Sequence, residues 1–209
     1  MRLHTILTTF ALAALATAAY AQDSNVIGIA PDVFQVRYAS NLNKGDSVVN
    51  ITNTGSTDLT SGHAANICAN VYTFDPSEEM VSCCSCMVTP NALVSLSVQG
   101  DLISNTLSPS TPTAVVIKLV ATQTGSGNSC SPSVENTLAP GLRAWGTTLH
   151  ALPTTPVTYG VSETAFLPGG LNQREWDHLT AFCNFINVNG SGFGICKSCR
   201  TGGLGGAKE

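Results

Sequence analysis

The chain has 209 residues, with 9 Lys and Arg against 13 Asp and Glu and a formal net charge of −4 at neutral pH. Only 11% of the residues are charged and the basic ones form no cluster, which argues against nucleic acid or an anionic membrane surface as a partner. Ser, Thr, Asn and Gly supply much of the remaining polarity, a composition typical of extracellular β-proteins and surface-structure proteins.

The first residues are typical of a secretory signal peptide. A cationic start at residues 1–4 precedes an apolar run from 5 to 19, and Ala19-Tyr20-Ala21 forms a small-x-small cleavage site. Cleavage after Ala21 removes residues 1–21 and predicts a secreted chain that is extracellular, on the cell surface or periplasmic. The alternative is a membrane anchor that stays attached. No later segment resembles a membrane span, so we expect none after cleavage.

Residues 22–166 predict one antiparallel β-sandwich domain. Short apolar or alternating runs recur along this stretch, with Gly, Pro and Asn between them. From Ala92 to Val98 every second residue is apolar, which puts these side chains on one face. The most apolar run, Thr113–Thr122, is predicted to be a central strand. The expected strands are Val33–Tyr38, Ser47–Thr52, Ile67–Phe74, Met80–Val88, Ala92–Val98, Thr113–Thr122, Leu142–Leu152 and Val157–Phe166.

Two resemblances accompany these patterns. The segment Gly45–Gly55 (GDSVVNITNTG) resembles a strand pair in bacterial immunoglobulin-like surface modules, which implies that the sandwich is immunoglobulin-like. The elements Cys-Cys-Ser-Cys at 83–86 and Cys-Lys-Ser-Cys-Arg at 196–200 resemble a group of uncharacterised exported bacterial Cys-rich proteins. The second resemblance carries no function with it.

One amphipathic helix is predicted in residues 167–200, a small C-terminal appendage. Asn172 is the expected N-cap, and Glu175 three residues later completes a capping-box-like pair. Asn189–Gly192 ends the helix, and the Gly-rich residues 201–209 predict a flexible tail. The apolar face of the helix is predicted to consist of Trp176, Leu179, Phe182, Cys183 and Ile186.

Eight cysteines follow the signal peptide, and their even number in an exported chain predicts four disulfides. Cys84 and Cys86 share one face of an extended strand while Cys83 points to the other, so this strand is expected to be linked on both sides. We also expect Cys196 or Cys199 to close a local loop with Cys183. The full set is Cys68, Cys83, Cys84, Cys86, Cys130, Cys183, Cys196 and Cys199.

Metal binding is the alternative use of these cysteines. Cys83 and Cys86 have Cys-x-x-Cys spacing, as do Cys196 and Cys199, and two such pairs can supply four thiolates to zinc. The predicted oxidising compartment favours disulfides instead. Redox-active thiols are less consistent with the pattern, because the second pair follows a helix and no βαβ pattern is present.

Few residues suggest catalysis. His-Glu-x-x-His, Gly-x-Ser-x-Gly, the Walker phosphate loop and Gly-x-Gly-x-x-Gly are all absent from the sequence. Asp75, Glu78 and Glu79 form a tight carboxylate cluster, which is either a calcium site or, as we favour, a solvated loop. His150 or His63 could combine with this cluster in a hydrolytic site. No cofactor is predicted.

The sequence therefore predicts a non-enzymatic exported structural, adhesive or interaction protein. Its uncharged polar surface suits weak contacts with surface polymers, with glycans or with other copies of the chain, and strand exchange is one route to self-association. The first alternative is an exported hydrolase that acts on polysaccharide or peptide. The second is a periplasmic metal or redox protein that uses the two Cys-x-x-Cys pairs.

Overall fold

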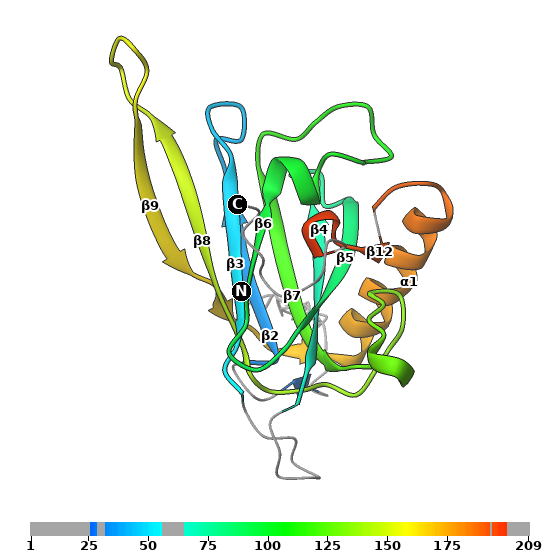
Figure 1. Cartoon of the computed structure of the whole chain (residues 1–209). Helices are drawn as coiled ribbons and strands as arrows, with labels where there is room; N and C mark the ends of the chain where they lie inside the picture. The colour runs from blue at the N-terminus through cyan, green and yellow to red at the C-terminus, as the bar shows by residue number, and fades with distance from the viewer. Residues whose placement is uncertain (1–25, 29–31, 56–64, 193, 200–209) are drawn as a thin grey trace, which may run out of the picture.

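The structure of the chain is a computed structural model that describes residues 26–28, 32–55, 65–192 and 194–199. Within these residues the chain is mainly β, with two larger sheets and one α-helix (Figure 1). The predicted β class is therefore confirmed. Residues 1–21 and 201–209, predicted to be the signal peptide and the tail, lie outside the described residues.

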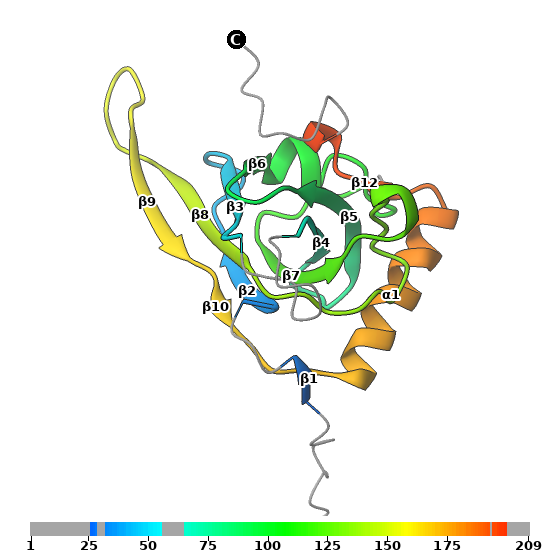
Figure 2. The same ribbon diagram turned by 60° about the horizontal axis from the view of Figure 1, so that its bottom comes forward.

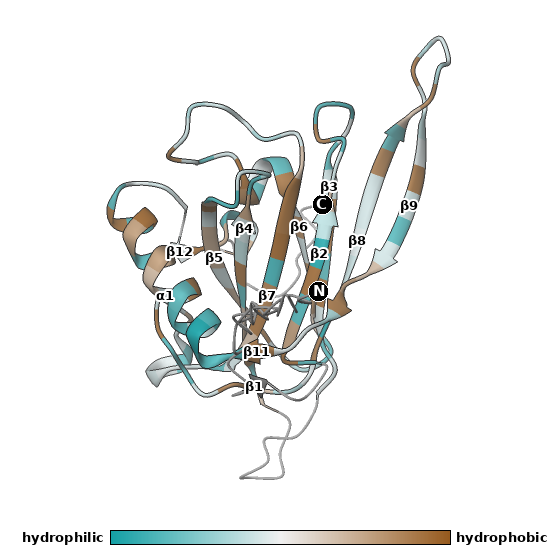
Figure 3. Cartoon of the chain, turned by 180° about the vertical axis from the view of Figure 1, so that it is seen from behind, coloured by the Kyte–Doolittle hydropathy of each residue, from teal (hydrophilic) through white to brown (hydrophobic). Residues whose placement is uncertain are grey.

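The larger sheet has six strands: β2 (Phe34–Ala39), β4 (Ile67–Phe74), β5 (Met80–Val88), β7 (Val115–Gln123), β10 (Leu167–Pro168) and β12 (Gly194–Ile195). Their order is β10-β2-β7-β4-β5-β12, and all neighbours are antiparallel except β12, which runs parallel to β5. The hydrophobic β7 lies inside this sheet (Figure 3), as the apolar run Thr113–Thr122 predicts.

The smaller sheet has four strands: β3 (Ser47–Asn53), β6 (Leu93–Ser97), β8 (Leu142–Ala151) and β9 (Tyr159–Ala165). Their order is β6-β3-β8-β9, with antiparallel neighbours throughout. A separate pair joins β1 (Val26–Gly28) to β11 (Leu171–Asn172) just before the helix. The chain changes between the two large sheets several times, and the last such change is from β9 of the smaller sheet to β10 of the larger one.

The main hydrophobic core lies between the two large sheets. Val49 and Ile51 of β3 point inward and are buried. Val94 and Leu96 of β6 do the same, which confirms the alternation predicted for Ala92–Val98. Ile117 of β7 meets them from the opposite sheet. Each such side chain contributes about 1.5–3 kcal/mol on full burial, so the two sheets are held together mainly by this layer.

The helix α1 (Gln173–Val188) packs on the outer face of the six-stranded sheet (Figure 2). Asn172 is its N-cap, as predicted, and the Asn172 side chain accepts a hydrogen bond from the Glu175 amide at 2.8 Å. The Glu175 carboxylate does not complete the capping box, because it accepts from Lys118 Nζ of β7 at 2.5 Å. The helix and the sheet enclose a second core that includes Trp176 and Tyr72.

The predicted apolar face of α1 is wrong at Phe182. Its side chain is 45% exposed, whereas Trp176, Leu179, Cys183 and Ile186 are buried. At roughly 100° per residue, Phe182 lies about 80° from the middle of the buried face. A helix on a sheet buries a narrow stripe, so a side chain this far round the helix stays in solvent.

Candidate functional site

The hairpin formed by β8 and β9 projects from the body of the molecule on the side away from α1 (Figures 1 and 2). The start of β8 is part of the core, since Leu142 and Ala144 are buried. Towards its tip the hairpin leaves the core. β9 is the border strand of its sheet, and nearly all of its residues are exposed.

The outer edge of β9 carries a regular row of backbone groups that no other described strand pairs with. At one end of the hairpin the Leu152 amide donates to the Thr158 carbonyl at 2.8 Å, and at the other the Phe166 amide donates to Ala144 at 2.9 Å. The register between them has no bulge. Because bonded and non-bonded pairs alternate in an antiparallel ladder, every second residue of β9 points its backbone away from β8. These outward residues are Tyr159, Val161, Glu163 and Ala165.

The side chains of the outward residues add an apolar surface to this edge. They pair across the hairpin as Tyr159 with Ala151, Val161 with Leu149, and Ala165 with Trp145. Tyr159 is 49% exposed and Val161 is 65% exposed. Glu163 is the only charged residue of β9, and its carboxylate accepts from Thr147 at 3.2 Å. The edge therefore offers both hydrogen-bonding groups and hydrophobic contacts. We call these four residues the β9 edge.

Natural border strands are often protected by Lys, Pro or a bulge, and β9 has none of these. The border strands of the six-stranded sheet differ from β9. The short β12 pairs with β5 at Cys84 and Ser85, and α1 packs against β5. The last strand at the other end of that sheet, β10, has only two residues and ends in Pro168. β9 is thus a seven-residue border strand whose β9 edge is open to strand addition.

Arg37 of β2 fixes the base of this hairpin. Its Nε donates to Thr164 Oγ1 at 3.1 Å and its Nη2 donates to Thr148 Oγ1 at 2.8 Å, so one guanidinium joins both strands. Gly146 leaves the space for it, because a Cβ there would lie 2.0 Å from Arg37 Cζ. Burial lowers the pKa of Arg37, which is only 8% exposed. The Arg37 contacts hold β9 in one orientation relative to the body.

The Arg37 guanidinium is incompletely paired. Among the described residues no carboxylate forms an ion pair with it, and its Nη1 has no hydrogen-bond partner. Its two acceptors are neutral hydroxyls. Arg37 therefore secures the hairpin by geometry and hydroxyl contacts and not by charge neutralisation.

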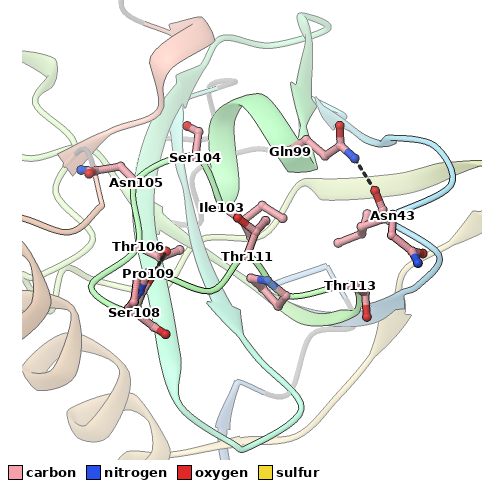
Figure 4. A pocket seen from close by; sticks show the side chains of 12 residues that line it. Asn43, Gln99, Ile103, Ser104, Asn105, Thr106, Ser108, Pro109, Thr111 and Thr113 are labelled. Carbon is pink, nitrogen blue, oxygen red and sulfur yellow. Dashed lines mark hydrogen bonds between the residues drawn. The ribbon is translucent and has the colours of Figure 1, made fainter.

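A pocket of about 560 Å³ is lined by residues of the 103–113 segment together with Leu42, Asn43 and Gln99 (Figure 4). None of its lining residues is charged. Much of its polarity is already used. The Gln99 side chain donates to the Leu42 carbonyl, and Asn105 Nδ2 donates to the carbonyls of Gly190 at 3.1 Å and Gly192 at 2.9 Å. These bonds stabilise the loop and tie it to the end of α1.

All eight cysteines form disulfides, and the strand β5 is linked on both sides as predicted. The expected local loop between Cys183 and Cys196 or Cys199 is wrong. The helix runs along β5, so Cys183 meets Cys83 on the outer face, while the segment after the helix returns to the inner face. The four bonds are Cys68–Cys130, Cys83–Cys183, Cys84–Cys196 and Cys86–Cys199.

The zinc alternative is not supported by this pairing. Cys83, Cys86, Cys196 and Cys199 are all oxidised, and neither Cys-x-x-Cys motif pairs within itself. The described part of the chain contains no group of three His, Cys, Asp or Glu that could hold a metal ion. A zinc or dithiol-disulfide centre would require breaking bonds that hold the C-terminal segment in place.

The carboxylate cluster Asp75, Glu78 and Glu79 occupies the turn between β4 and β5. Asp75 Oδ1 accepts from the amides of Ser77 at 2.8 Å and Glu79 at 3.0 Å, and Glu78 adopts a positive φ of 68°. The Asp75 side chain thus stabilises the turn itself. This local role accounts for the Asp without a calcium ion.

Among the described residues, His150 does not combine with Asp75, Glu78 and Glu79 into the hydrolytic site of the first alternative. His150 Nε2 lies 2.8 Å from Ser162 Oγ on the exposed hairpin, and within the described ranges no carboxylate hydrogen-bonds to this ring. A nucleophile and base without a third, orienting group in a cleft do not make a triad. His178 lies against the Phe182 ring at 4.2 Å on the surface of α1. His63 falls outside the described residues.

Neither the β9 edge nor Arg37 is among the site residues that the sequence predicts. The sequence predicts the strand Val157–Phe166, but its position at a border is not encoded in its own residues. Arg37 stands at an ordinary alternating position of a predicted strand. One signal was available, because the alternation of Tyr159, Val161 and Ala165 with Gly, Ser and Thr puts the apolar residues on one face.

No family model, no curated protein and no solved structure matches this chain. In the part of the chain that the structure covers, no helix has both the length and the apolar character needed to cross a bilayer. Function must therefore be inferred from the geometry of the chain itself.

Proposed function

We propose that this chain is a non-enzymatic exported interaction protein that binds its partner by strand addition at the β9 edge. The supporting observation is the row of outward backbone groups on Tyr159, Val161, Glu163 and Ala165 beside an exposed apolar surface. An added strand pairs with these groups through main-chain hydrogen bonds, and alternate side chains supply specificity.

The location of the protein is consistent with this role. Four disulfides fit an oxidising, extracellular or periplasmic environment. Secretion by cleavage after Ala21 remains a prediction. The low charge of the chain, 11% of its residues, suits contact with surface polymers, glycans or other protein surfaces.

Of the immunoglobulin-like assignment, the proposal keeps the two-sheet antiparallel architecture and not the strand order. The two-sheet antiparallel architecture and the pairing of β3 with β6 and β4 with β7 in opposite sheets support it. In the immunoglobulin constant arrangement the first, second, fourth and fifth strands share one sheet. Counting from β2, the first and fourth strands here lie in one sheet and the second and fifth in the other, so the likeness does not extend to this partition.

Binding to the surface of the cells that produce the protein tests the proposed function. Val161→Pro removes one outward N–H and puts a ring in the path of an added strand, while the bonds to β8 stay in place. Val161→Thr is the matched control, since it keeps the N–H and the β-branched shape. We expect Val161→Pro to weaken binding about tenfold, as a loss of about 1.4 kcal/mol does, and Val161→Thr to bind like the parent chain.

The assay measures the fraction of purified protein that sediments with washed cells over a range of protein concentrations. If Val161→Pro and the parent chain bind equally, the β9 edge is not the interaction surface and the proposed function is wrong. If neither binds, a surface-interaction role at these cells is wrong as well.

A further inference from the structure

The β9 edge is self-complementary, and we propose that its partner is the β9 edge of a second copy of this chain. Two copies pair antiparallel about a two-fold axis and join their four-stranded sheets into one continuous sheet of eight strands. This inference rests on the proposed function and names the partner of the same surface. Closed two-fold dimers are the commonest assemblies of soluble proteins.

The backbone pattern selects one register. A two-fold axis at Ser162 pairs Tyr159 with Ala165 and Val161 with Glu163 of the other copy, so every outward N–H and C=O of both β9 edges finds a partner. An axis at Val161 leaves one outward residue, Ala165, without a β9 partner. An axis at Glu163 puts two carboxylates directly opposite each other, which is destabilising. The axis at Ser162 therefore gives the most hydrogen bonds without that repulsion.

The side chains agree with this register. Tyr159 of one copy lies beside Ala165 of the other, which itself pairs with Trp145, so an apolar row crosses the joined sheets. Beyond the strands, the same register brings exposed Val157 of one copy towards exposed Leu167 of the other. Both lie next to β9 and are solvent-exposed in the single chain. A second copy thus covers apolar side chains at both ends of the edge.

The position of the hairpin leaves room for a second copy. β9 forms the outer border of the molecule in both views, and the body lies on its other side (Figures 1 and 2). The tip of each hairpin, residues 152–158, then lies beside the end of β9 of the partner. Arg37 fixes the hairpin base before association, so little ordering is needed on binding.

Sedimentation velocity of the purified chain from micromolar to millimolar concentration tests the partner. We expect a concentration-dependent dimer for the parent chain and for Val161→Thr, and a dissociation constant raised about tenfold for Val161→Pro. A parent chain that stays monomeric throughout overturns the self-association. In that case, loss of cell-surface binding by Val161→Pro still supports the proposed function with a different partner, so the two failures are distinguishable.

Cysteine substitution tests the register. At an axis through Ser162 the two Ser162 residues face each other as a non-hydrogen-bonded pair with Cα atoms about 4.5 Å apart, a separation that permits a disulfide. We expect Ser162→Cys to form a covalent dimer on mild oxidation and Val161→Cys to form little. Efficient crosslinking of Val161→Cys and not of Ser162→Cys contradicts the register. Peptide mapping after oxidation verifies that the four native disulfides are intact.

Discussion

The strands β5 and β9 lie towards opposite sides of the molecule and differ in how far other elements and disulfides protect them. β5 carries three disulfides, has β12 as its neighbour and packs against α1. β9 has no cysteine and an apolar face in solvent, and no described element covers its outer edge. None of the disulfides involves a strand of the four-stranded sheet. Disulfides and packed elements therefore protect β5, whereas among the described residues the outer edge of β9 has neither.

This difference indicates that β5 and its disulfides stabilise the fold, whereas the β9 edge is available to a partner. The three disulfides of β5 join this strand to the helix and to the C-terminal segment. The hairpin is instead secured at its base by Arg37, and its edge keeps its hydrogen-bonding groups free. Stability and interaction can therefore be changed independently by mutation.

The largest expected loss of stability lies at the disulfide that does not involve β5. Cys68–Cys130 spans 62 residues, and the chain-entropy model gives about 4 kcal/mol for such a loop. We expect Cys68→Ala with Cys130→Ala to lower the free energy of unfolding by this amount. Urea unfolding followed by circular dichroism measures the change.

Removal of one β5 disulfide, Cys86–Cys199, is expected to lower the free energy of unfolding less. Cys86–Cys199 spans 113 residues, but Cys84–Cys196 already joins the same two segments. Its removal releases only a few residues of chain and is expected to cost about 2 kcal/mol. A loss for Cys86→Ala with Cys199→Ala as large as that at Cys68–Cys130 contradicts this redundancy.

The next largest expected loss of stability depends on which way the backbone N–H of a β9 residue points. Ser162 points its N–H towards β8, and Val161 points its N–H to solvent. Ser162→Pro removes a ladder bond and is expected to cost about 3 kcal/mol of unfolding free energy. Val161→Pro removes none and is expected to cost less than about 1 kcal/mol. Equal losses in thermal or urea unfolding show that the backbone of β9 alternates differently from this assignment.

Gly146→Ala tests the attachment of the hairpin. The new Cβ overlaps the Arg37 guanidinium, so Arg37 must leave its site, at a cost of about 2 kcal/mol for overpacking. Arg37→Ala removes the obstacle. We therefore expect the double variant to be more stable than the sum of the single changes predicts, by about 1 kcal/mol or more. Additive losses in a double-mutant cycle contradict contact between the two residues.

The smallest effect is expected at the start of α1, on the closed side of the molecule. Asn172→Ala removes the side chain that accepts from the Glu175 amide and is expected to cost about 1 kcal/mol. Asn172→Asp keeps an acceptor and should cost much less. Urea midpoints of the two variants make the comparison. A midpoint for Asn172→Ala that matches the parent chain excludes a stabilising role for this cap.

Local patterns were sufficient to predict most elements. β4 and β5 coincide with the expected strands Ile67–Phe74 and Met80–Val88, and Asn172 caps the helix as its position predicts. Each of these depends on residues close in sequence: an apolar run bounded by turn residues, or a cap three residues from its donor. The opposite orientations of Cys83 and Cys84 follow in the same way from the two-residue period of a strand.

The partners of these elements were decided only by the tertiary structure. Cys183 lies 13 residues from Cys196, and proximity in sequence favours pairing them, yet a rigid 16-residue helix along β5 brings Cys183 to Cys83 instead. Phe182 falls outside the buried stripe because the sheet, not the helix, sets the width of the contact. The sequence by itself determined which segments form strands and which helix is capped, because those depend on neighbouring residues. That β9 is a border, and that Arg37 lies beneath it, depends on which strands pair across long stretches of chain, and only the packed sheets specify that.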